Sequence, residues 1–510
     1  MRESGMLFPV FSLPSKFGIG SFSREAFEFV DFLEKSGQGF WQILPIGPTG
    51  FGNSPYQPFS AFAGNPYFIS PEVLIEEGFL NWDDVNGLDF GSNEQQVDYG
   101  ALYENRPVVL KKAYARFKER KDEKEFYEAF LKKEDFWLKD YALFTAIKEE
   151  KKGASWLTWE DDLRKRDAKA LKEAEERLKD EIDYVCFVQY EFDKQWTKLR
   201  RYANSKNVKI IGDLPFYVSM DSSDAWAHPE VFQMDKDLVP KVVAGCPPDA
   251  FSGTGQLWGN PIYDWDGMKK NDYDWWVKRI SRNYEFYDVI RIDHFHGFCD
   301  YYAVPYGDET AEKGTLKKGP GMDLFRVLKK KVKELADLKE EDGFKIIAED
   351  LGNNTPENEQ LLKDTGFPGM KVLQYGFTSW DSYYVNHRHT KNSVVYTGTH
   401  DNTPSRAWFE EINDGQRDFA RRYINSMNSD YGQFVWDFIR EAYRSVADLC
   451  VIPLQDYLCE GKEARINTPG AQDGNWQWRL RPNYLSEALA QSIRGLTELY
   501  SRIPKEKEEV

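Results

Sequence analysis

The sequence contains few cysteines, and their spacing follows no pairing pattern. Five occur among 510 residues, and no two of them form a CxxC motif. An odd number of scattered cysteines argues against a disulfide framework and against a cysteine-ligated zinc site. We therefore expect reduced thiols and a cytoplasmic protein. The five residues are Cys186, Cys246, Cys299, Cys450 and Cys459.

Several other patterns are missing. No uninterrupted apolar run reaches the roughly 18 residues expected of a transmembrane helix. No GxGxxG motif precedes a helical pattern, and GxxxxGK[ST] does not occur, so nothing indicates a phosphate-binding loop. The net charge of −17 argues against nucleic acid or an anionic membrane as the main partner. We expect no cofactor.

Aromatic residues, in contrast, are abundant, at 15% of the chain. Most are expected to pack in the core, but flat rings also stack on sugars. Two long stretches, residues 47–66 and 244–263, interleave aromatics with turn-forming residues, and loops of that length usually have a function. We interpret the first as a binding loop in which Tyr56 faces a ligand. The second is predicted to be an irregular lid that carries Asp249, Phe251, Gln256 and Trp258.

Eight strand-like segments alternate with helical patterns, which predicts a (β/α)8 barrel. The chain is expected to be a single domain, 1–510, with a mostly helical insertion at about 71–205. Further insertions at the barrel mouth are expected at about 47–66, 219–285 and 457–480. Residues 5–20 are interpreted as a loop leading into the fold. The eight segments are residues 37–45, 66–70, 207–218, 288–296, 344–352, 369–377, 394–399 and 447–456.

Three of these segments end in acidic residues, namely Asp293, Glu349 and Asp401. Parallel barrel strands present their C-terminal ends at one mouth, so the three acids would share a site. Retaining glycosidic chemistry needs two carboxyl groups about 5–5.5 Å apart, one as nucleophile and one as proton donor. Arg291 faces the same way as Asp293 on a strand and would keep that carboxylate ionised. Glu349 is then the natural general acid/base, held protonated by burial and acidic neighbours.

Two alternatives compete with this interpretation. Acids and histidines at strand ends, such as His294, His296 and His400, also bind zinc or magnesium in hydrolases built on barrels. The sequence has no HExxH motif and no HxH at the end of its first strand, so we expect no metal site. A non-enzymatic carbohydrate-binding module would need the aromatics, but neither three acids nor 510 residues.

The motifs resemble those of the 4-α-glucanotransferases (amylomaltase or disproportionating enzyme) of glycoside hydrolase family 77. The RxDH, AED and THD motifs alone would indicate only the wider α-amylase clan, whereas SPYQ and GQxWGNPxY narrow the resemblance to this family. It implies a (β/α)8 barrel without a separate C-terminal β-domain. The matching stretches span residues 47–479 and read GPTGFGNSPYQPFSAFAGNPYFISPE, IIGDLPFYV, PPDAFSGTGQLWGNPIY, IRIDHFHGF, IIAEDLG, GTHDN and NTPGAQDGNWQWR.

The resemblance also implies a role for each matching residue. Asp293 looks like the nucleophile, Glu349 like the general acid/base and Asp401 like the transition-state stabiliser. Ala471 departs from the family, which usually has Thr after the Pro-Gly pair, and this puts one loop hydrogen bond in doubt. The implied substrate-binding residues are Tyr56, Asp213, Asp249, Phe251, Gln256, Trp258, Arg291, His294, His400 and Asn467.

The implied reaction is transfer of a segment of a 1,4-α-D-glucan to the 4-hydroxyl of an acceptor through a covalent glycosyl-enzyme. The expected substrates are maltooligosaccharides and glucans derived from starch or glycogen, with glucose among the acceptors, acted on by a monomer or homodimer. An α-amylase-type hydrolase with the same three acids is the alternative. A long aromatic lid that excludes water favours transfer.

Overall fold

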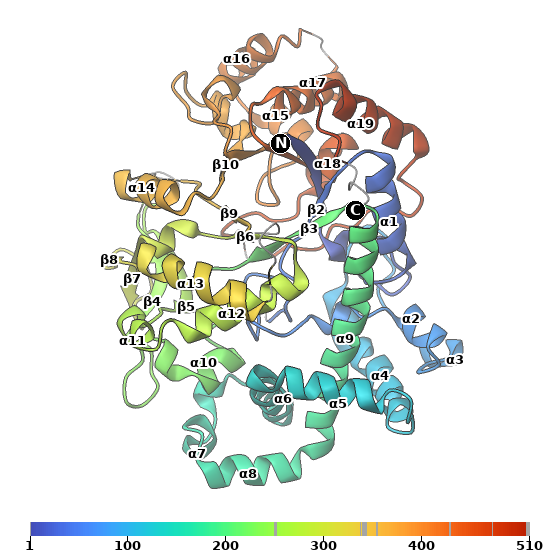
Figure 1. Ribbon diagram of the computed structural model, residues 1–510, viewed down its shortest axis with the longest axis vertical. Coiled ribbons are helices and arrows are strands. Elements are labelled where there is room, and N and C mark those ends of the chain that lie inside the picture. Colours follow the sequence, from blue (N-terminus) through green and yellow to red (C-terminus); the bar gives the residue numbers. More distant parts are fainter. Residues whose placement is uncertain are drawn as a thin grey trace.

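Eight parallel strands form a closed barrel in the computed structural model, which describes residues 2–50, 52–248, 252–336, 338, 344–352, 355–427, 430–471 and 473–505. Their order around the ring is β1-β12-β11-β10-β9-β6-β3-β2, and β2 pairs again with β1. The predicted (β/α)8 barrel is therefore confirmed (Figure 1). The strands are β1 (Glu3–Leu7), β2 (Phe40–Gln42), β3 (Lys209–Leu214), β6 (Val289–Ile292), β9 (Ile346–Ala348), β10 (Gly369–Val372), β11 (Ser393–Tyr396) and β12 (Leu449–Pro453).

The barrel begins earlier in the chain than its sequence pattern indicates. Residues 5–20 were predicted to be a loop, but they overlap β1, which pairs on both sides with β2 and β12. A Cβ atom on Gly5 would lie 2.6 Å from Cβ of Phe40, so glycine is needed for the close approach of β1 to β2. The prediction of a strand at residues 66–70 is wrong. This segment contains a 3₁₀ helix (Pro66–Phe68), whose start is capped by the side chain of Asn65.

The chain between β2 and β3 is mostly helical and leads back to the barrel through a long helix, α9 (Lys179–Ser205). Its residues Phe192, Trp196, Leu199 and Ala203 are buried at helical spacing, so one stripe of α9 packs inward. Figure 1 shows α5 to α8 gathered below the barrel, with α9 running up to it. The other helices of this segment are α2 (Pro71–Glu76), α3 (Trp82–Val85), α4 (Tyr99–Phe117), α5 (Lys124–Lys133), α6 (Asp135–Glu150), α7 (Asp161–Arg164) and α8 (Ala168–Arg177).

A second, antiparallel sheet of order β5-β4-β7-β8 lies beside the barrel (Figure 1). It consists of β4 (Val242–Cys246), β5 (Gln256–Pro261), β7 (Asp300–Pro305) and β8 (Thr315–Lys318). The prediction that residues 244–263 are irregular is therefore wrong at both ends, because β4 and β5 pair there as a hairpin. The Gly and Pro residues in the sequence 244–263 favour turns, but pairing of β4 with β7 holds β4 in a sheet.

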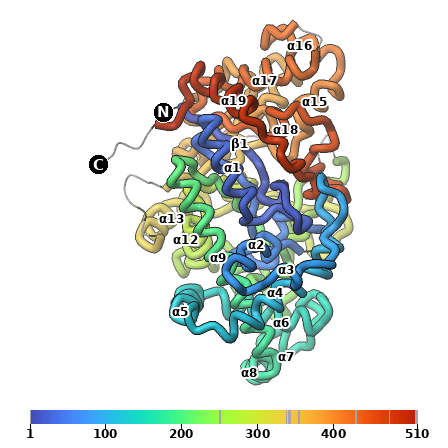
Figure 2. The backbone as a smooth tube through the Cα atoms, turned by 90° about the vertical axis from the view of Figure 1, so that its right-hand side faces the viewer, coloured from blue at the N-terminus to red at the C-terminus, as the bar shows by residue number. Residues whose placement is uncertain are grey.

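The remaining helices lie between or after the barrel strands in the chain. Helix α1, between β1 and β2, buries Phe29, Val30 and Leu33 and lies next to α19 (Figure 2). Among the described residues, no helix has the length and apolar character needed to cross a membrane. These helices are α1 (Arg24–Lys35), α10 (Ser223–Ala227), α11 (Trp265–Lys270), α12 (Asp274–Phe286), α13 (Met322–Leu335), α14 (Pro356–Thr365), α15 (Ser405–Glu411), α16 (Asp414–Ile424), α17 (Tyr431–Arg444), α18 (Leu454–Tyr457) and α19 (Glu487–Leu499).

Candidate active site

Two of the predicted acids follow neighbouring barrel strands. Asp293 comes directly after β6 and Glu349 directly after β9, and these two strands are paired. The backbone N–H of Glu349 donates to the carbonyl of Ile292 at 3.0 Å, so the ladder continues to the level of the acids. Both carboxyl groups are thereby held at the C-terminal end of the barrel, where the fold presents its functional residues.

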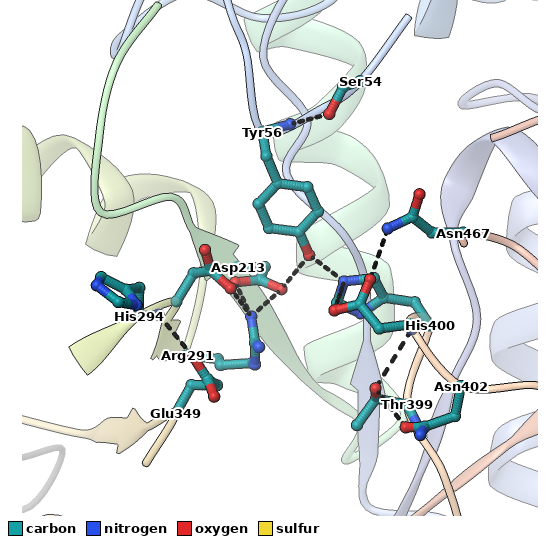
Figure 3. A network of polar contacts seen from close by, with 12 residues as sticks. Ser54, Tyr56, Asp213, Arg291, His294, Glu349, Thr399, His400, Asn402 and Asn467 are labelled. Carbon is teal, nitrogen blue, oxygen red and sulfur yellow. Dashed lines mark hydrogen bonds and ion pairs between the residues drawn. The ribbon is translucent and has the colours of Figure 1, made fainter. Parts of the chain in front are cut away.

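Arg291 on β6 connects these acids to Asp213 on β3. Its Nη1 donates to both carboxylate oxygens of Asp213 at 2.6 Å and to Oδ1 of Asp293 at 3.3 Å (Figure 3). The side chains of Arg291 and Asp213 are 3% and 0% exposed, whereas that of Asp293 is 30% exposed. Burial lowers the pKa of Arg291, but Asp213 and Asp293 together raise it well above its usual range. Asp213 is therefore the closer partner of Arg291, which was expected to keep Asp293 ionised.

Asp293 and Glu349 compete for ionisation. Burial raises the pKa of Asp293 well above its usual range; Arg291 opposes this rise, and the charge of Glu349 adds to it. Burial also raises the pKa of Glu349, against the opposing effects of Arg291 and of backbone N–H groups from His294 and Leu351 at 2.8 and 3.0 Å. Two neighbouring acids that both resist ionisation favour a state in which one of them keeps a proton.

His294 adopts a left-handed backbone conformation, with φ of 49°. This turn directs its backbone N–H toward Glu349, while its ring packs edge-to-face against Trp258 on β5, with centroids 5.2 Å apart. Burial lowers the pKa of His294 to about 4, with a smaller contribution from His296. The ring is therefore neutral near neutral pH.

On the other side of the site, Tyr56 contacts His400 and Asp213. The Tyr56 hydroxyl lies 2.8 Å from both Oδ2 of Asp213 and Nε2 of His400 (Figure 3). Burial and the charge of Asp213 raise the pKa of Tyr56 well above its usual range, so the phenol keeps its proton and donates it to Asp213. Nε2 of His400 must then carry the hydrogen that reaches the Tyr56 oxygen.

The third predicted acid, Asp401, follows β11 and is held by Asn467. Nδ2 of Asn467 donates to Oδ1 of Asp401 at 2.6 Å, and Nε2 of His400 lies 3.4 Å from Oδ2 of the same carboxylate. The Asp401 side chain is 37% exposed. Tyr56, His400 and Asn467 thus link Asp401 to Asp213 in one polar network around three barrel strands (Figure 3).

Comparison with known proteins identifies the family of this chain. A family model described as 4-α-glucanotransferase covers residues 8–486. The chain belongs to the 4-α-glucanotransferase family. A 4-α-glucanotransferase from Clostridium butyricum is 46% identical over 96% of this chain and 99% of its own length. One from Streptococcus pneumoniae TIGR4 is 45% identical over 98% of both.

Solved structures agree with the sequence comparison. The amylomaltase of Streptococcus agalactiae, solved in complex with acarbose, superimposes with a TM-score of 0.94 at 41% identity, and the match covers 98% of this chain and 100% of that one. The amylomaltase of Corynebacterium glutamicum has a TM-score of 0.75 at 19% identity, which shows a shared fold. The match covers 99% of this chain and 75% of the Corynebacterium chain.

Sequence reasoning missed Arg465, which holds the Asp401 side of this transferase site. Its Nε donates to the carbonyl of Asn467 at 2.8 Å, its Nη1 to Oγ1 of Thr403 at 2.7 Å and its Nη2 to the carbonyl of Asp401 at 2.9 Å. The only available signal was its position two residues before Asn467 in a predicted mouth loop. Trp476, in the same loop, packs against Tyr56 and His400 with centroids 5.8 and 6.2 Å away.

The predicted lid residues divide into two groups. Gln256 and Trp258 lie on β5, where Nε1 of Trp258 donates to Oε1 of Gln256 at 3.2 Å. Asp249 and Phe251 lie outside the described residues. At Ala471, the backbone carbonyl accepts a hydrogen bond from Nδ2 of Asn475 at 3.0 Å, so this loop contact does not depend on the Ala471 side chain.

The expectation that the protein has no metal site stays a prediction. Among the side chains that the structure describes, no group of three or more His, Cys, Asp or Glu is arranged to hold a metal ion.

Proposed function

We propose that this transferase moves a segment of a 1,4-α-D-glucan to the 4-hydroxyl of an acceptor glucan or glucose by a retaining double displacement. The observation that carries the proposal is the pair Asp293 and Glu349 at the ends of adjacent strands, with both pKa values raised by burial. Asp293 is the proposed nucleophile, since its side chain is partly exposed while that of Asp213 is fully buried. Glu349 is the proposed general acid/base.

In the first step, Asp293 attacks C1 of the glucan and the glycosidic bond breaks. Glu349 gives its proton to the departing 4-oxygen, and a covalent glycosyl–Asp293 ester forms. In the second step, Glu349 takes the proton from the 4-hydroxyl of the acceptor, whose oxygen attacks C1 and releases Asp293. Asp401, oriented by Asn467 and Arg465, would accept hydrogen bonds from sugar hydroxyls and favour ring distortion toward the transition state.

Transfer rather than hydrolysis requires an acceptor sugar to be bound and water to be excluded. Positioning of a bound hydroxyl is worth effective molarities of about 10⁵ M or more, which exceeds the concentration of water. Tyr56, Trp258 and Trp476 surround the neutral histidines of the site and are proposed to supply that positioning, together with Phe251. Asp249 and Gln256 are proposed as further glucan contacts.

The proposal also covers the substrates, the domain organisation, the location and the assembly of the enzyme. Maltooligosaccharides and glucans derived from starch or glycogen are the proposed substrates, and the barrel with its insertions is proposed to act as one catalytic domain. No disulfide joins any of the five cysteines, all of which the structure describes, and burial raises the pKa of Cys186 to about 12, which supports a proposed cytoplasmic location with unreactive thiols. A monomer or homodimer is the proposed assembly.

Substitution of the three acids tests the assigned roles. Asp293→Asn, Glu349→Gln and Asp401→Asn should each lower turnover on maltotriose by roughly 10²- to 10⁴-fold or more, while circular dichroism shows an intact fold. Asp364→Asn is the matched control, because Asp364 is an exposed acid on α14 and should keep wild-type activity. Near wild-type turnover in any one of the three would remove that residue from the mechanism.

A further inference from the structure

The segment between β10 and β11 leads outward from the proposed site. It begins with the 3₁₀ helix η6 (Leu373–Phe377), which contains Tyr375. The Tyr375 hydroxyl accepts a hydrogen bond from Nδ2 of Asn402 at 3.0 Å, and Asn402 directly follows Asp401. Burial raises the pKa of Tyr375, and the charges of Asp401 and Glu349 raise it further. Through Asn402, Tyr375 is therefore connected to the strand end that carries Asp401.

The loop after η6 folds back onto Tyr375. The Oγ of Ser382 donates to the carbonyl of Tyr375 at 3.0 Å, and the Tyr384 ring lies edge-on to the Tyr375 ring with centroids 5.5 Å apart. Tyr383 stands between these two contacting residues, yet 63% of its surface is exposed. Nη1 of Arg388 donates to the carbonyl of Asp381 at 2.6 Å and closes the loop. The loop is thus braced by hydrogen bonds while its Tyr383 ring faces solvent.

Trp380 in the same loop is also exposed and is held from one side only. Its ring packs on Phe419 of α16 with centroids 4.5 Å apart and an interplanar angle of 33°, while 74% of its surface remains exposed. An indole fixed on one face and open on the other is preorganised for stacking. Isolated exposed aromatics are ordinary, but rings clustered on a braced loop beside an active site indicate a binding surface.

We propose that Tyr383 and Trp380 form an outer binding surface for the acceptor chain of an α-1,4-glucan. This inference rests on the function proposed above. The C–H faces of glucose rings are apolar and stack on indole and phenol rings. Asp381 and Ser379 of the same loop, both exposed, supply polar groups for sugar hydroxyls.

The geometry assigns this surface to the acceptor side. Glu349 protonates the departing 4-oxygen and later deprotonates the incoming one, so leaving and accepting chains both extend from the side of Glu349. Tyr375 follows β10, which pairs with β9, and Glu349 comes directly after β9, so the loop after η6 lies on that side of the barrel mouth. Glucose alone would not reach Tyr383 and Trp380, because it ends at the reaction centre. The surface should therefore favour long acceptors over short ones.

The experiment compares acceptors while the donor is held constant. α-Maltotriosyl fluoride is the donor, because its leaving group is fluoride and leaves the acceptor side empty. Initial rates of formation of the product that is three glucose units longer give kcat/KM for maltoheptaose and for glucose. The double variant Trp380→Ala/Tyr383→Ala should lower the ratio of these two constants about tenfold, which corresponds to about 1.4 kcal/mol lost over the two contacts.

Trp82→Ala is the matched control. Trp82 is an exposed aromatic on α3, 50% accessible and part of a different segment, and its loss should leave the ratio unchanged. If the wild-type enzyme transfers but the double variant keeps the wild-type ratio, this inference alone is overturned. The same holds if kcat/KM falls equally for maltoheptaose and for glucose, because the ratio is then unchanged. A wild-type enzyme that hydrolyses the fluoride without elongating either acceptor would overturn the proposed function together with it.

Discussion

At the scale of single residues, one guanidinium lies between the acids of the proposed site. Arg291 is bound most closely by Asp213, so its charge only partly offsets the burial of Asp293. This arrangement leaves the two reacting carboxyls with raised pKa values and favours a state in which only one of them is ionised. Backbone N–H groups fix the position of Glu349, the proposed carrier of that proton.

The raised pKa of Glu349 makes a prediction about pH. The protonated form is the active acid, so cleavage of a glycosidic bond should decline as pH rises through the raised pKa of Glu349. Cleavage should also decline at low pH, where the nucleophile Asp293, whose pKa is raised as well, takes up a proton. His294, with a pKa of about 4, should not contribute an ionisation near neutral pH. An α-glycosyl fluoride needs no proton to leave. Glu349→Gln should therefore still give a fluoride burst in single-turnover measurements, without the wild-type decline at alkaline pH.

Two outcomes would count against this account. An alkaline decline that persists at the same pH in Glu349→Gln would assign the ionisation to another group. Absence of any fluoride burst in that variant, with the fold intact by circular dichroism, would show that Glu349 is needed for more than proton transfer.

Arg465 supports a second prediction at this scale. It donates to the carbonyls of Asp401 and Asn467 and to the Thr403 hydroxyl, and lysine cannot reproduce that fork. Arg465→Lys should misplace Asp401 and lower kcat on maltotriose by about 10- to 100-fold, with a smaller change in KM. Arg406→Lys is the control, since Arg406 is half-exposed and pairs with Glu410. Unchanged kcat in Arg465→Lys would refute a positioning role.

At the scale of elements, close packing of β3 against the start of β6 positions Asp213 and Arg291. A Cβ atom on Gly212 of β3 would lie 2.1 Å from the ring of Tyr287, which is 2% exposed and cannot move aside. Gly212→Ala should therefore destabilise the barrel by about 1–3 kcal/mol through overpacking. Thermal unfolding measures the effect as a lowered Tm.

A glycine without neighbours provides the contrast. Gly495 lies in α19, and a Cβ atom there would meet nothing within 4 Å. Gly495→Ala should raise stability by up to about 1 kcal/mol, because alanine favours helix more than glycine does. Equal Tm values for Gly212→Ala and the wild type would show that β3 and Tyr287 can separate without cost.

The elements also show which parts of the fold the sequence could predict. Apolar runs such as residues 288–296 and 394–399 correspond to β6 and β11, because buried parallel strands are continuously hydrophobic. β1 was missed because Ser4 and Gly5 give it no such run, and its stability comes from pairing with β2 and β12. The hairpin of β4 and β5 was missed for the same reason, since its pairing with β7 is not encoded locally.

At the scale of the whole molecule, closure of the barrel brings together residues that are far apart in the chain. The positions of Asp293, Glu349 and Asp401 at one mouth were predictable, because strand ends meet there in any parallel barrel. Their partners were not predictable from spacing. The hydrogen bond from Tyr56 to Asp213 spans 157 residues, and that from Asn467 to Asp401 spans 66. Such contacts depend on how the mouth loops pack.

The central claim is that the enzyme transfers glucan segments instead of hydrolysing them. Transfer depends on mouth loops from distant parts of the chain, so it is a property of the whole molecule. Incubation of the purified protein with maltotriose as sole substrate tests it most directly, with products resolved by chromatography and reducing ends counted over time. The account predicts glucose together with a ladder of longer maltooligosaccharides, while the number of reducing ends stays nearly constant. A steady rise in reducing ends, with no product longer than maltotriose, would contradict it.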